Sequence, residues 1–172
     1  SQCLLISLAV WQFGIGPLLD RLPLTQTLTG QKCSIDSVIA FCRPHTVKGT
    51  ILACVSGYLL ISVYFSKSAL WTLLLVLLSG VAANVFIVGI NQLVDVESDI
   101  VNKKKLPLAT KELEWSTGRN IVGVAWCLAV NISFYQSFFW GSIITSMCVI
   151  GIVYSVPPFR LKRFALPAAL CI

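Results

Sequence analysis

Charged residues are scarce in this chain. Lys, Arg, Asp and Glu make up 12% of its 172 residues, whereas a soluble domain carries about 25%. Hydrophobic residues make up 56%. Four long stretches contain no charged residue at all: 49–65, 69–94, 121–139 and 141–156. This scarcity excludes an ordinary water-soluble domain.

Each uncharged stretch has roughly the length of a membrane-spanning helix. An α-helix rises ~1.5 Å per residue, so about 20 apolar residues cross the hydrocarbon layer of a bilayer. The four stretches therefore predict four complete spans, the last of them short. The C-terminal sequence LPAALCI, at 166–172, predicts the beginning of a fifth. We expect an all-α, multi-span transmembrane helical bundle.

The basic residues are divided unevenly between the two ends of the predicted spans. If the spans alternate in direction, the N-terminal segment and the loops at 95–119 and 157–165 share one side, and only Lys67 lies opposite. Because cytoplasmic loops carry an excess of Lys and Arg, we expect the first side to be cytoplasmic, or its organellar equivalent. The net charge of +6 then needs no nucleic acid to explain it. The basic residues of that side are Arg21, Lys32, Arg43, Lys48, Lys103, Lys104, Lys105, Lys111, Arg119, Arg160, Lys162 and Arg163.

The N-terminal part of the chain has a different character from the rest. The apolar run CLLISLAVWQFGIG is too short to span a bilayer comfortably, so we expect a remnant of a longer apolar segment or an interfacial helix. Residues 20–38 are predicted to be a polar linker. We therefore divide the chain into an N-terminal segment at 1–40, a possible transit-peptide or linker remnant, and a helical domain at 41–172. The seven cysteines contain no CxxC pair and predict no disulfide or metal framework.

Carboxylates gather where the second span ends, in the sequence NQLVDVESD at 91–99. On one helix at about 100° per residue, Asn84, Asn91, Asp95 and Asp99 share an arc of about 80°, and Glu97 points away. Two aspartates four residues apart repel each other, and a divalent cation removes that conflict. Mg²⁺ is usually held by one or two carboxylates and the phosphate oxygens of a substrate. An isolated DxxxD is more often a solvated helix end, but the amides on the same face favour a site.

A second group of candidate residues follows the fourth span, in VYSVPPFRLKR at 153–163. The two prolines stop a helix, Tyr154 and Ser155 lie on its last turn, and Arg160 and Lys162 follow on the side of the acidic residues. The alternative is a proline-terminated helix with basic membrane anchors. A third sequence, FCRPHT at 41–46, opens the first span with Arg43, and we expect its histidine to be structural.

These sequences carry a resemblance to a known family. NQLVDVESDIVNKKKLPLA, at 91–109, resembles the first aspartate-rich motif, NQxxDxxxD, of the UbiA superfamily of intramembrane prenyltransferases. FCRPHT, NVFIVGINQL and YSVPPFRLKRFALPAALCI are similar to the plant plastid branch, which holds homogentisate, flavonoid, coumarin and phloroglucinol prenyltransferases. The resemblance covers about 41–172. It implies a bundle of about nine helices and an integral membrane protein of the plastid.

The resemblance also implies a reaction and its residues. Two aspartate-rich motifs of the family hold Mg²⁺ and the diphosphate of an allylic prenyl donor, and an aromatic ring, that of homogentisate, a flavonoid or a similar phenol, attacks the allylic cation. By this match Asp95 and Asp99 are the catalytic, metal-binding carboxylates. The resemblance, together with the patterns above, makes these residues substrate-binding candidates: Asn84, Asn91, Lys103, Arg43, Tyr154, Ser155, Arg160 and Lys162. The other expected partner is membrane lipid.

Two alternatives stay open. A non-enzymatic membrane protein, such as a divalent-cation carrier or a helical subunit, would also be apolar, although a carrier places its charged groups near the middle of several spans. An inactive, truncated prenyltransferase is the other, because the second aspartate-rich motif of the family lies beyond the fifth span. We therefore expect residues 1–172 alone to insert into membranes but to transfer no prenyl group. The sequence specifies neither the aromatic acceptor, the donor length, the ring position nor the oligomeric state.

Overall fold

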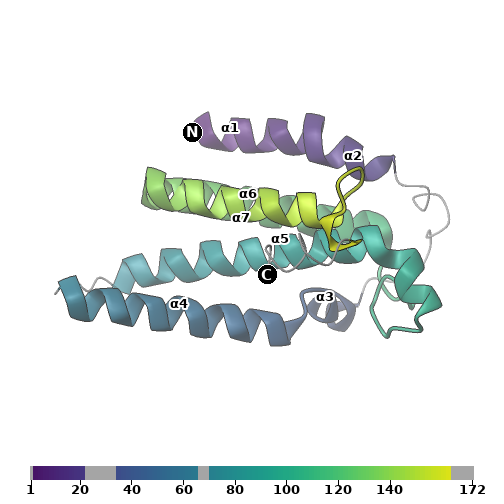
Figure 1. Ribbon diagram of the computed structural model, residues 1–172, viewed down its shortest axis with the longest axis horizontal. Coiled ribbons are helices and arrows are strands. Elements are labelled where there is room, and N and C mark those ends of the chain that lie inside the picture. Colours follow the sequence, from purple (N-terminus) through teal and green to yellow (C-terminus); the bar gives the residue numbers. More distant parts are fainter. Residues whose placement is uncertain (1, 22–33, 66–69, 164–172) are drawn as a thin grey trace.

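The protein is a bundle of antiparallel helices. The computed structural model describes residues 2–21, 34–65 and 70–163, and every regular element in those ranges is helical. The four long helices are α4 (Pro44–Phe65), α5 (Leu70–Val101), α6 (Trp115–Gln136) and α7 (Phe138–Ser155), and each runs opposite to the one before it (Figure 1). The all-α prediction is confirmed.

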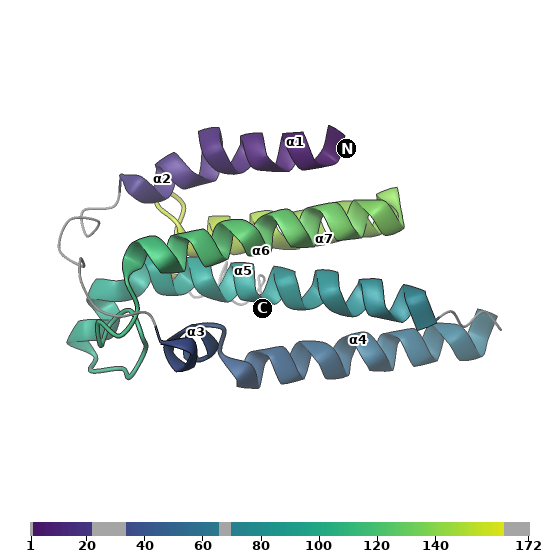
Figure 2. The ribbon, with the colours of Figure 1, turned by 180° about the vertical axis from the view of Figure 1, so that it is seen from behind.

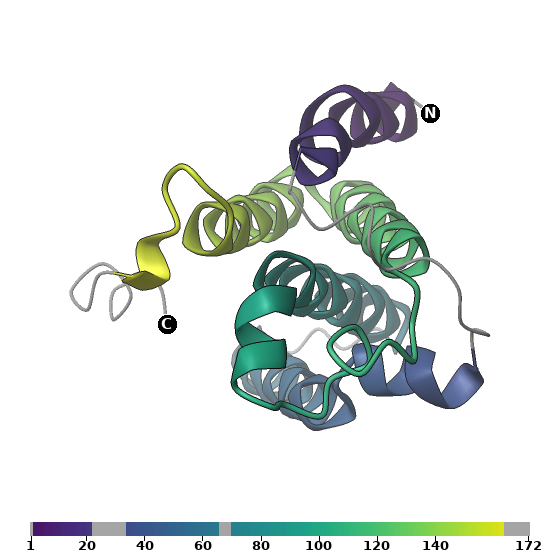
Figure 3. The same cartoon turned by 90° about the vertical axis from the view of Figure 1, so that its right-hand side faces the viewer.

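Helix α5 is the centre of the bundle. It packs against α4, α6 and α7, and Figure 3 shows it end-on with these three helices around it. Phe86, Ile90 and Leu93 are fully buried on it. Gly89 lets α6 approach α5 closely, since a Cβ at position 89 would lie 2.4 Å from Val122 of α6. Because α5 runs on for two turns beyond its uncharged part, its acidic residues are carried on the same rigid helix.

In the part of the chain that the structure describes, four helices are long and apolar enough to cross a membrane: Gln2–Asp20, Pro44–Val63, Leu70–Val101 and Phe138–Ser155. The last three correspond to predicted spans. The predicted third span is a helix, α6, but it begins earlier than expected, carries Arg119 in its second turn and is less apolar than the other three.

The N-terminal run is longer than the sequence suggested. Its helix, formed by α1 (Gln2–Ala9), a π-helical segment (Val10–Ile15) and α2 (Gly16–Asp20), continues past the apolar run to 19 residues. The expectation that it is too short to span is therefore wrong. Gly16 and Pro17 lie at the start of α2, directly after the π-helical segment, where the proline leaves out one hydrogen bond of the helix.

The prediction of a polar linker at 20–38 is wrong for its last residues, which are helical. Ser34 caps a short helix, α3 (Ile35–Phe41), by accepting a hydrogen bond from the amide of Asp36 at 3.3 Å. Phe41, the last residue of α3, is fully buried. The predicted domain boundary at position 40 falls inside α3 and stays a prediction. Residues 22–33, and the predicted fifth helix at 166–172, lie outside the described residues.

The helix directions match those expected from the charges. The end of α2, the start of α4, the end of α5, the start of α6 and the end of α7 all lie at one end of the bundle, as Figures 1 and 2 show from opposite sides. The described basic residues of the predicted cytoplasmic side are at this end. Lys67, the single basic residue expected opposite, lies outside the described residues.

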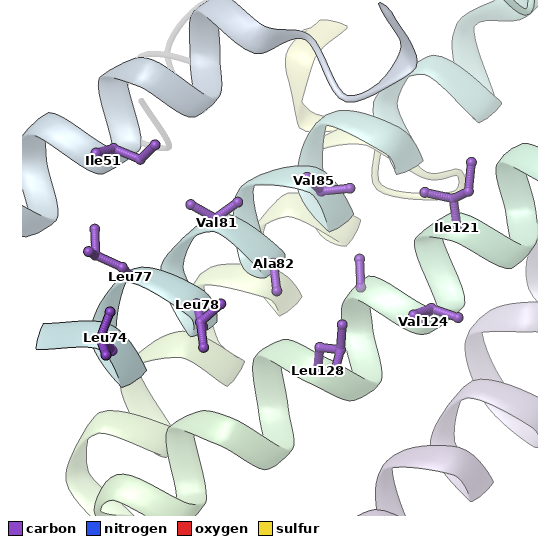
Figure 4. A pocket seen from close by; sticks show the side chains of 11 residues that line it. Ile51, Leu74, Leu77, Leu78, Val81, Ala82, Val85, Ile121, Val124 and Leu128 are labelled. Carbon is purple, nitrogen blue, oxygen red and sulfur yellow. The ribbon is translucent and has the colours of Figure 1, made fainter. Parts of the chain in front are cut away.

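An apolar cavity of about 560 Å³ opens between α4, α5 and α6 (Figure 4). All eleven residues that line it have aliphatic side chains, among them Ile51 of α4, Leu78 of α5 and Val124 of α6. We call it the apolar cavity.

Candidate functional site

A second cavity, of about 600 Å³, lies where α5 leaves the bundle. One wall is the last two turns of α5, and the other is the segment that follows α7. We call it the polar cavity. Its lining residues are Val94, Asp95, Glu97, Ser98, Val101, Arg160, Lys162 and Arg163.

Asp95 is the acidic residue of this cavity that the basic residues contact. Its carboxylate accepts a hydrogen bond from the guanidinium of Arg160 at 2.9 Å and pairs with the ammonium of Lys162. The same ammonium donates to the side-chain oxygen of Asn91 at 2.8 Å. The predicted face of α5 thus brings Asn91 and Asp95 to one cation. The side chain of Asp95 stays 19% exposed, so it is open to the cavity.

The positions of Arg160 and Lys162 depend on how α7 ends. The helix stops at Ser155 and is followed by Pro157 and Pro158, which cannot continue its hydrogen-bond ladder. Arg160 then adopts a left-handed backbone conformation, with φ 39°, and its amide donates to the carbonyl of Val156 at 3.0 Å. This turn folds the chain back, and a 3-10 turn at Leu161–Arg163 places Lys162 against α5.

The charges favour an anion in the polar cavity. Arg160, Lys162 and Arg163 face Asp95 and Glu97, so the lining carries one net positive charge. Burial lowers the pKa of Lys162 because it disfavours the ammonium, and the neighbouring Asp95 opposes this effect. The Nε atom of Arg160 is buried and has no hydrogen-bond partner among the described residues. A guanidinium with an unused donor and a partly desolvated ammonium suit phosphate oxygens.

The two predicted aspartates have different surroundings. Asp99 is 4% exposed and pairs with Lys104 at 2.8 Å, and it does not line the polar cavity. Lys104 is therefore the lysine that meets an acid here, whereas Lys103 is exposed and its expected role in binding the diphosphate stays a prediction. Glu97, which we expected to point away from the site, lies on the rim of the cavity with Asp95. The joint role of Asp95 and Asp99 stays a prediction.

The residues around the polar cavity offer a divalent cation some of the ligands that it needs. Within the described ranges, no three His, Cys, Asp or Glu side chains come close enough together to hold a metal by themselves. Asp95, however, offers a carboxylate that is open to the cavity, and Glu97 and Ser98 add oxygen atoms to the same lining. Oxygen-only ligands suit Mg²⁺, which commonly uses one or two carboxylates together with substrate phosphates. These oxygen atoms suit a metal ion that a bound ligand also coordinates. They do not suit a metal ion that is coordinated by protein side chains alone.

The remaining predicted residues lie outside the polar cavity. The side-chain oxygen of Asn84 accepts a hydrogen bond from Thr46 at 3.0 Å, so Asn84 faces α4. Arg43 is in the left-handed region, with φ 49°, at the junction of α3 and α4. Tyr154 is half-buried, and Ser155 is buried with a hydroxyl that no described residue hydrogen-bonds. The substrate-binding roles of these four residues stay predictions.

Sequence reasoning missed Gln92 and Ser98. Gln92 is 3% exposed, and its side-chain nitrogen donates to the carbonyl of Phe41 at 2.7 Å, which ties α3 to α5. A glutamine within an uncharged span was the available signal, because a buried amide needs a partner. Ser98 lines the polar cavity and accepts a hydrogen bond from Asn102 at 3.3 Å. Nothing in the sequence distinguished it from an exposed serine.

Comparison with known proteins points to one family. The profile of the UbiA prenyltransferase family matches residues 50–172. Homogentisate phytyltransferase of Synechocystis sp. is 40% identical over 144 residues, which are 81% of this chain and 47% of that protein. Homogentisate solanesyltransferase, chloroplastic, of Arabidopsis thaliana is 36% identical over 171 residues, 91% of this chain and 39% of that protein.

Another relative, whose name gives a different acceptor, is 2-acylphloroglucinol 4-prenyltransferase, chloroplastic, of Humulus lupulus. It is 32% identical over 158 residues, which are 84% of this chain and 37% of that protein. The chain thus spans less than half the length of these three relatives. No solved structure gives a significant match to the chain.

Proposed function

The chain belongs to the UbiA prenyltransferase family, and from this premise we propose that the whole protein transfers a prenyl group from an allylic prenyl diphosphate to an aromatic acceptor. The relatives support this proposal, because their names give homogentisate or an acylphloroglucinol as the acceptor. We propose an acceptor of the same chemical kind: homogentisate, a flavonoid or a similar phenol. Two of these relatives are named as chloroplastic, which supports a plastid membrane as the location.

The observation that carries the proposal is the polar cavity at the end of an apolar bundle. Asp95 lies there between Arg160 and Lys162, in the last two turns of a helix whose residues 70–94 carry no charge. A prenyl diphosphate has the same division, with a charged head and a hydrocarbon tail. The head would sit in the polar cavity while the tail stays at the level of the spans.

The basic residues would bind and orient the diphosphate. Arg160 and Lys162 now neutralise Asp95, and both can turn their donors to phosphate oxygens once a cation occupies the carboxylate. Arg163, exposed on the same lining, adds a third positive charge. Donors that are already in place stabilise the negative charge that develops on the leaving diphosphate, without the cost of reorganising water.

We propose Mg²⁺ as the cofactor, held by Asp95 and the phosphate oxygens, with Asp99 as the second carboxylate that the family motif implies. When bound, the ion would act as a Lewis acid that neutralises charge on the departing diphosphate. Asp99 would first have to give up Lys104, whose side chain is 57% exposed and can reach solvent.

The surrounding apolar helices would protect the allylic cation from water. A cation at the membrane end of the polar cavity is safe only if water is kept out until the aromatic carbon attacks it. Val94 and Val101 supply apolar walls on the α5 side. The apolar cavity has no lining residue in common with the polar cavity, so we do not place the prenyl tail there.

The proposal is tested in membranes that contain the full protein. Labelled geranyl, dimethylallyl or phytyl diphosphate is offered with homogentisate or flavonoid acceptors, and product is measured for the wild type, Asp95→Ala and Asp36→Ala. Asp36 is an exposed carboxylate of α3 and serves as the matched control. We expect turnover in the wild type and the control and none in Asp95→Ala. Equal turnover in Asp95→Ala, or no product from any pair of substrates, would contradict the proposal.

A further inference from the structure

We propose that Gln2–Asp20 is an additional membrane-spanning helix of the assembled protein and that a buried polar clamp around Ser7 docks it on α6. We call Gln2–Asp20 the N-terminal helix. It lies before residue 50, where the family match begins, so the proposal is independent of the proposed function. The sequence left two possibilities open, a remnant of an apolar segment or an interfacial helix, and the contacts favour a spanning helix over an interfacial one.

The clamp joins the second turn of the N-terminal helix to the middle of α6. Ser7 is 2% exposed. The indole nitrogen of Trp126 donates to the backbone carbonyl of Ser7 at 3.1 Å, and the side-chain nitrogen of Asn131 donates to its hydroxyl at 2.8 Å. The hydroxyl of Ser7 itself donates to the carbonyl of Leu4 at 3.0 Å, and Cys127 of α6 lies beside the Ser7 side chain. Polar groups at bilayer depth need hydrogen-bond partners within the protein. Here two donors of α6 find their acceptors on Ser7 of the N-terminal helix.

Two further contacts extend the docking along the helix. At its C-terminal end, the carboxylate of Asp20 pairs with the guanidinium of Arg119 at 2.9 Å. Between this ion pair and the clamp, Trp11 packs on Gly123, where an added Cβ would lie 2.6 Å from the indole ring. A small residue that admits a large partner is the usual way in which membrane helices approach closely. The contacts thus run over several turns, which an interfacial helix lying across the bundle would not show.

The opposite face of the N-terminal helix is apolar and uncovered. Leu5, Ile6 and Phe13 are 68%, 63% and 82% exposed. In water this face would be unfavourable, whereas in hydrocarbon it needs no cover. Figures 1 and 3 show the helix beside α6, on the outside of the bundle and away from α4.

The packing also sets the direction of the helix. The helix runs from the side of the bundle where α4 meets α5 toward the end that holds the polar cavity (Figure 1), where Asp20 pairs with Arg119 near the start of α6. The proposal therefore places Gln2 on the membrane side opposite to Lys104. The polar clamp fixes the position of the N-terminal helix against α6. Basic residues at the membrane surface alone would not fix that position.

Cross-linking tests the docking in the full chain. Cys127 is kept, the other cysteines are replaced by alanine, and Ser7→Cys is introduced, with a protease site placed between positions 22 and 33. After oxidation with a membrane-permeable reagent and cleavage, a disulfide between positions 7 and 127 keeps the two fragments together on a non-reducing gel. The matched control is Leu5→Cys, at nearly the same depth but on the exposed face. We expect most Ser7→Cys chains to be cross-linked and the control to stay at background.

A second comparison addresses the close approach at Gly123. Gly123→Leu fills the space of the Trp11 ring and should reduce the cross-linked fraction severalfold, whereas Val124→Leu, on an exposed position of the same helix, should leave it unchanged. Labelling of Gln2→Cys and Lys104→Cys with an impermeant reagent gives an independent readout. Labelling from opposite sides supports the proposal. Equal cross-linking of positions 5 and 7, or labelling of positions 2 and 104 from the same side, would overturn it.

Discussion

The carboxylate of Asp95 lies 2.9 Å from the guanidinium of Arg160, a residue 65 positions further along the chain. This contact closes the polar cavity, because it holds the segment after α7 against the end of α5. Lys162 reinforces it from the same segment by bridging Asn91 and Asp95. The carboxylate proposed to meet a metal and the cations proposed to meet a diphosphate therefore neutralise each other until both ligands arrive.

The first prediction concerns the donor head group. Lys162→Met should raise the KM for the prenyl diphosphate about tenfold or more, because a hydrogen bond to a charged group is worth about 1.5–3 kcal/mol. The KM for the aromatic acceptor should not change. Steady-state kinetics in membranes, with each substrate varied in turn, measure both values. Lys105→Met is the control, since Lys105 is exposed and does not line the polar cavity. An equal effect of the two substitutions would show a general surface-charge effect instead of a binding site.

The second prediction separates the acids of α5. Asp99→Ala should abolish turnover, as Asp95→Ala should, because the family motif uses both carboxylates, whereas Glu97→Ala should be mild. Product formation at matched protein level and saturating Mg²⁺ measures this. The structure sharpens the test, because Glu97 and not Asp99 lines the polar cavity with Asp95. If Glu97→Ala were inactive and Asp99→Ala active, the second carboxylate of the site would be Glu97.

The long helices could be predicted from the sequence because their cause is local. Uncharged stretches of sufficient length have one stable form in a bilayer, the helix, and α4, α5, α6 and α7 overlap the predicted stretches, although α6 begins earlier than its own. Asn91 and Asp95 share a partner for an equally local reason, since they are four residues apart on one helix. The pattern could therefore assign Asp95 to the site.

The partners of these residues could not be predicted in the same way. That Lys162 reaches Asp95 depends on the turn at Arg160, and that Lys104, not Lys103, reaches Asp99 depends on how the chain leaves α5. The position of the N-terminal helix depends on Ser7 meeting residues more than a hundred positions away. Such contacts are decided by tertiary packing, on which periodicity carries no information.

The third prediction concerns orientation in the membrane. Lys104 and Arg160 should lie on one side and Lys67 on the other, because α5 and α7 end at the same end of the bundle (Figure 1) and the basic residues gather there. Single cysteines at these positions, in a cysteine-free chain, are labelled with an impermeant reagent from each side in turn. Labelling of positions 67 and 104 from the same side would show that α5 does not cross the membrane.

The last prediction concerns the contact that holds α3, α5 and α6 together behind the site. A Cβ at position 89 would lie 2.4 Å from Val122 and 3.3 Å from the ring of Phe41, and both of these side chains are fully buried. Gly89→Ala should therefore destabilise the protein by about 1–3 kcal/mol, the usual cost of overpacking a core. The apparent Tm in detergent, from the fraction that stays monodisperse after heating, measures the effect.

Two further variants decide whether this contact is the cause. Val122→Ala removes the atom that is closest to the added Cβ, so the double variant Gly89→Ala/Val122→Ala should have a higher Tm than Gly89→Ala alone. Gly57→Ala is the matched control, because no atom lies within 4 Å of a Cβ added there. Alanine favours a helix over glycine by up to about 1 kcal/mol, so this variant should be neutral or slightly stabilised. A Gly89→Ala protein as stable as Gly57→Ala would show that α5 and α6 lie further apart than the packing at Gly89 requires.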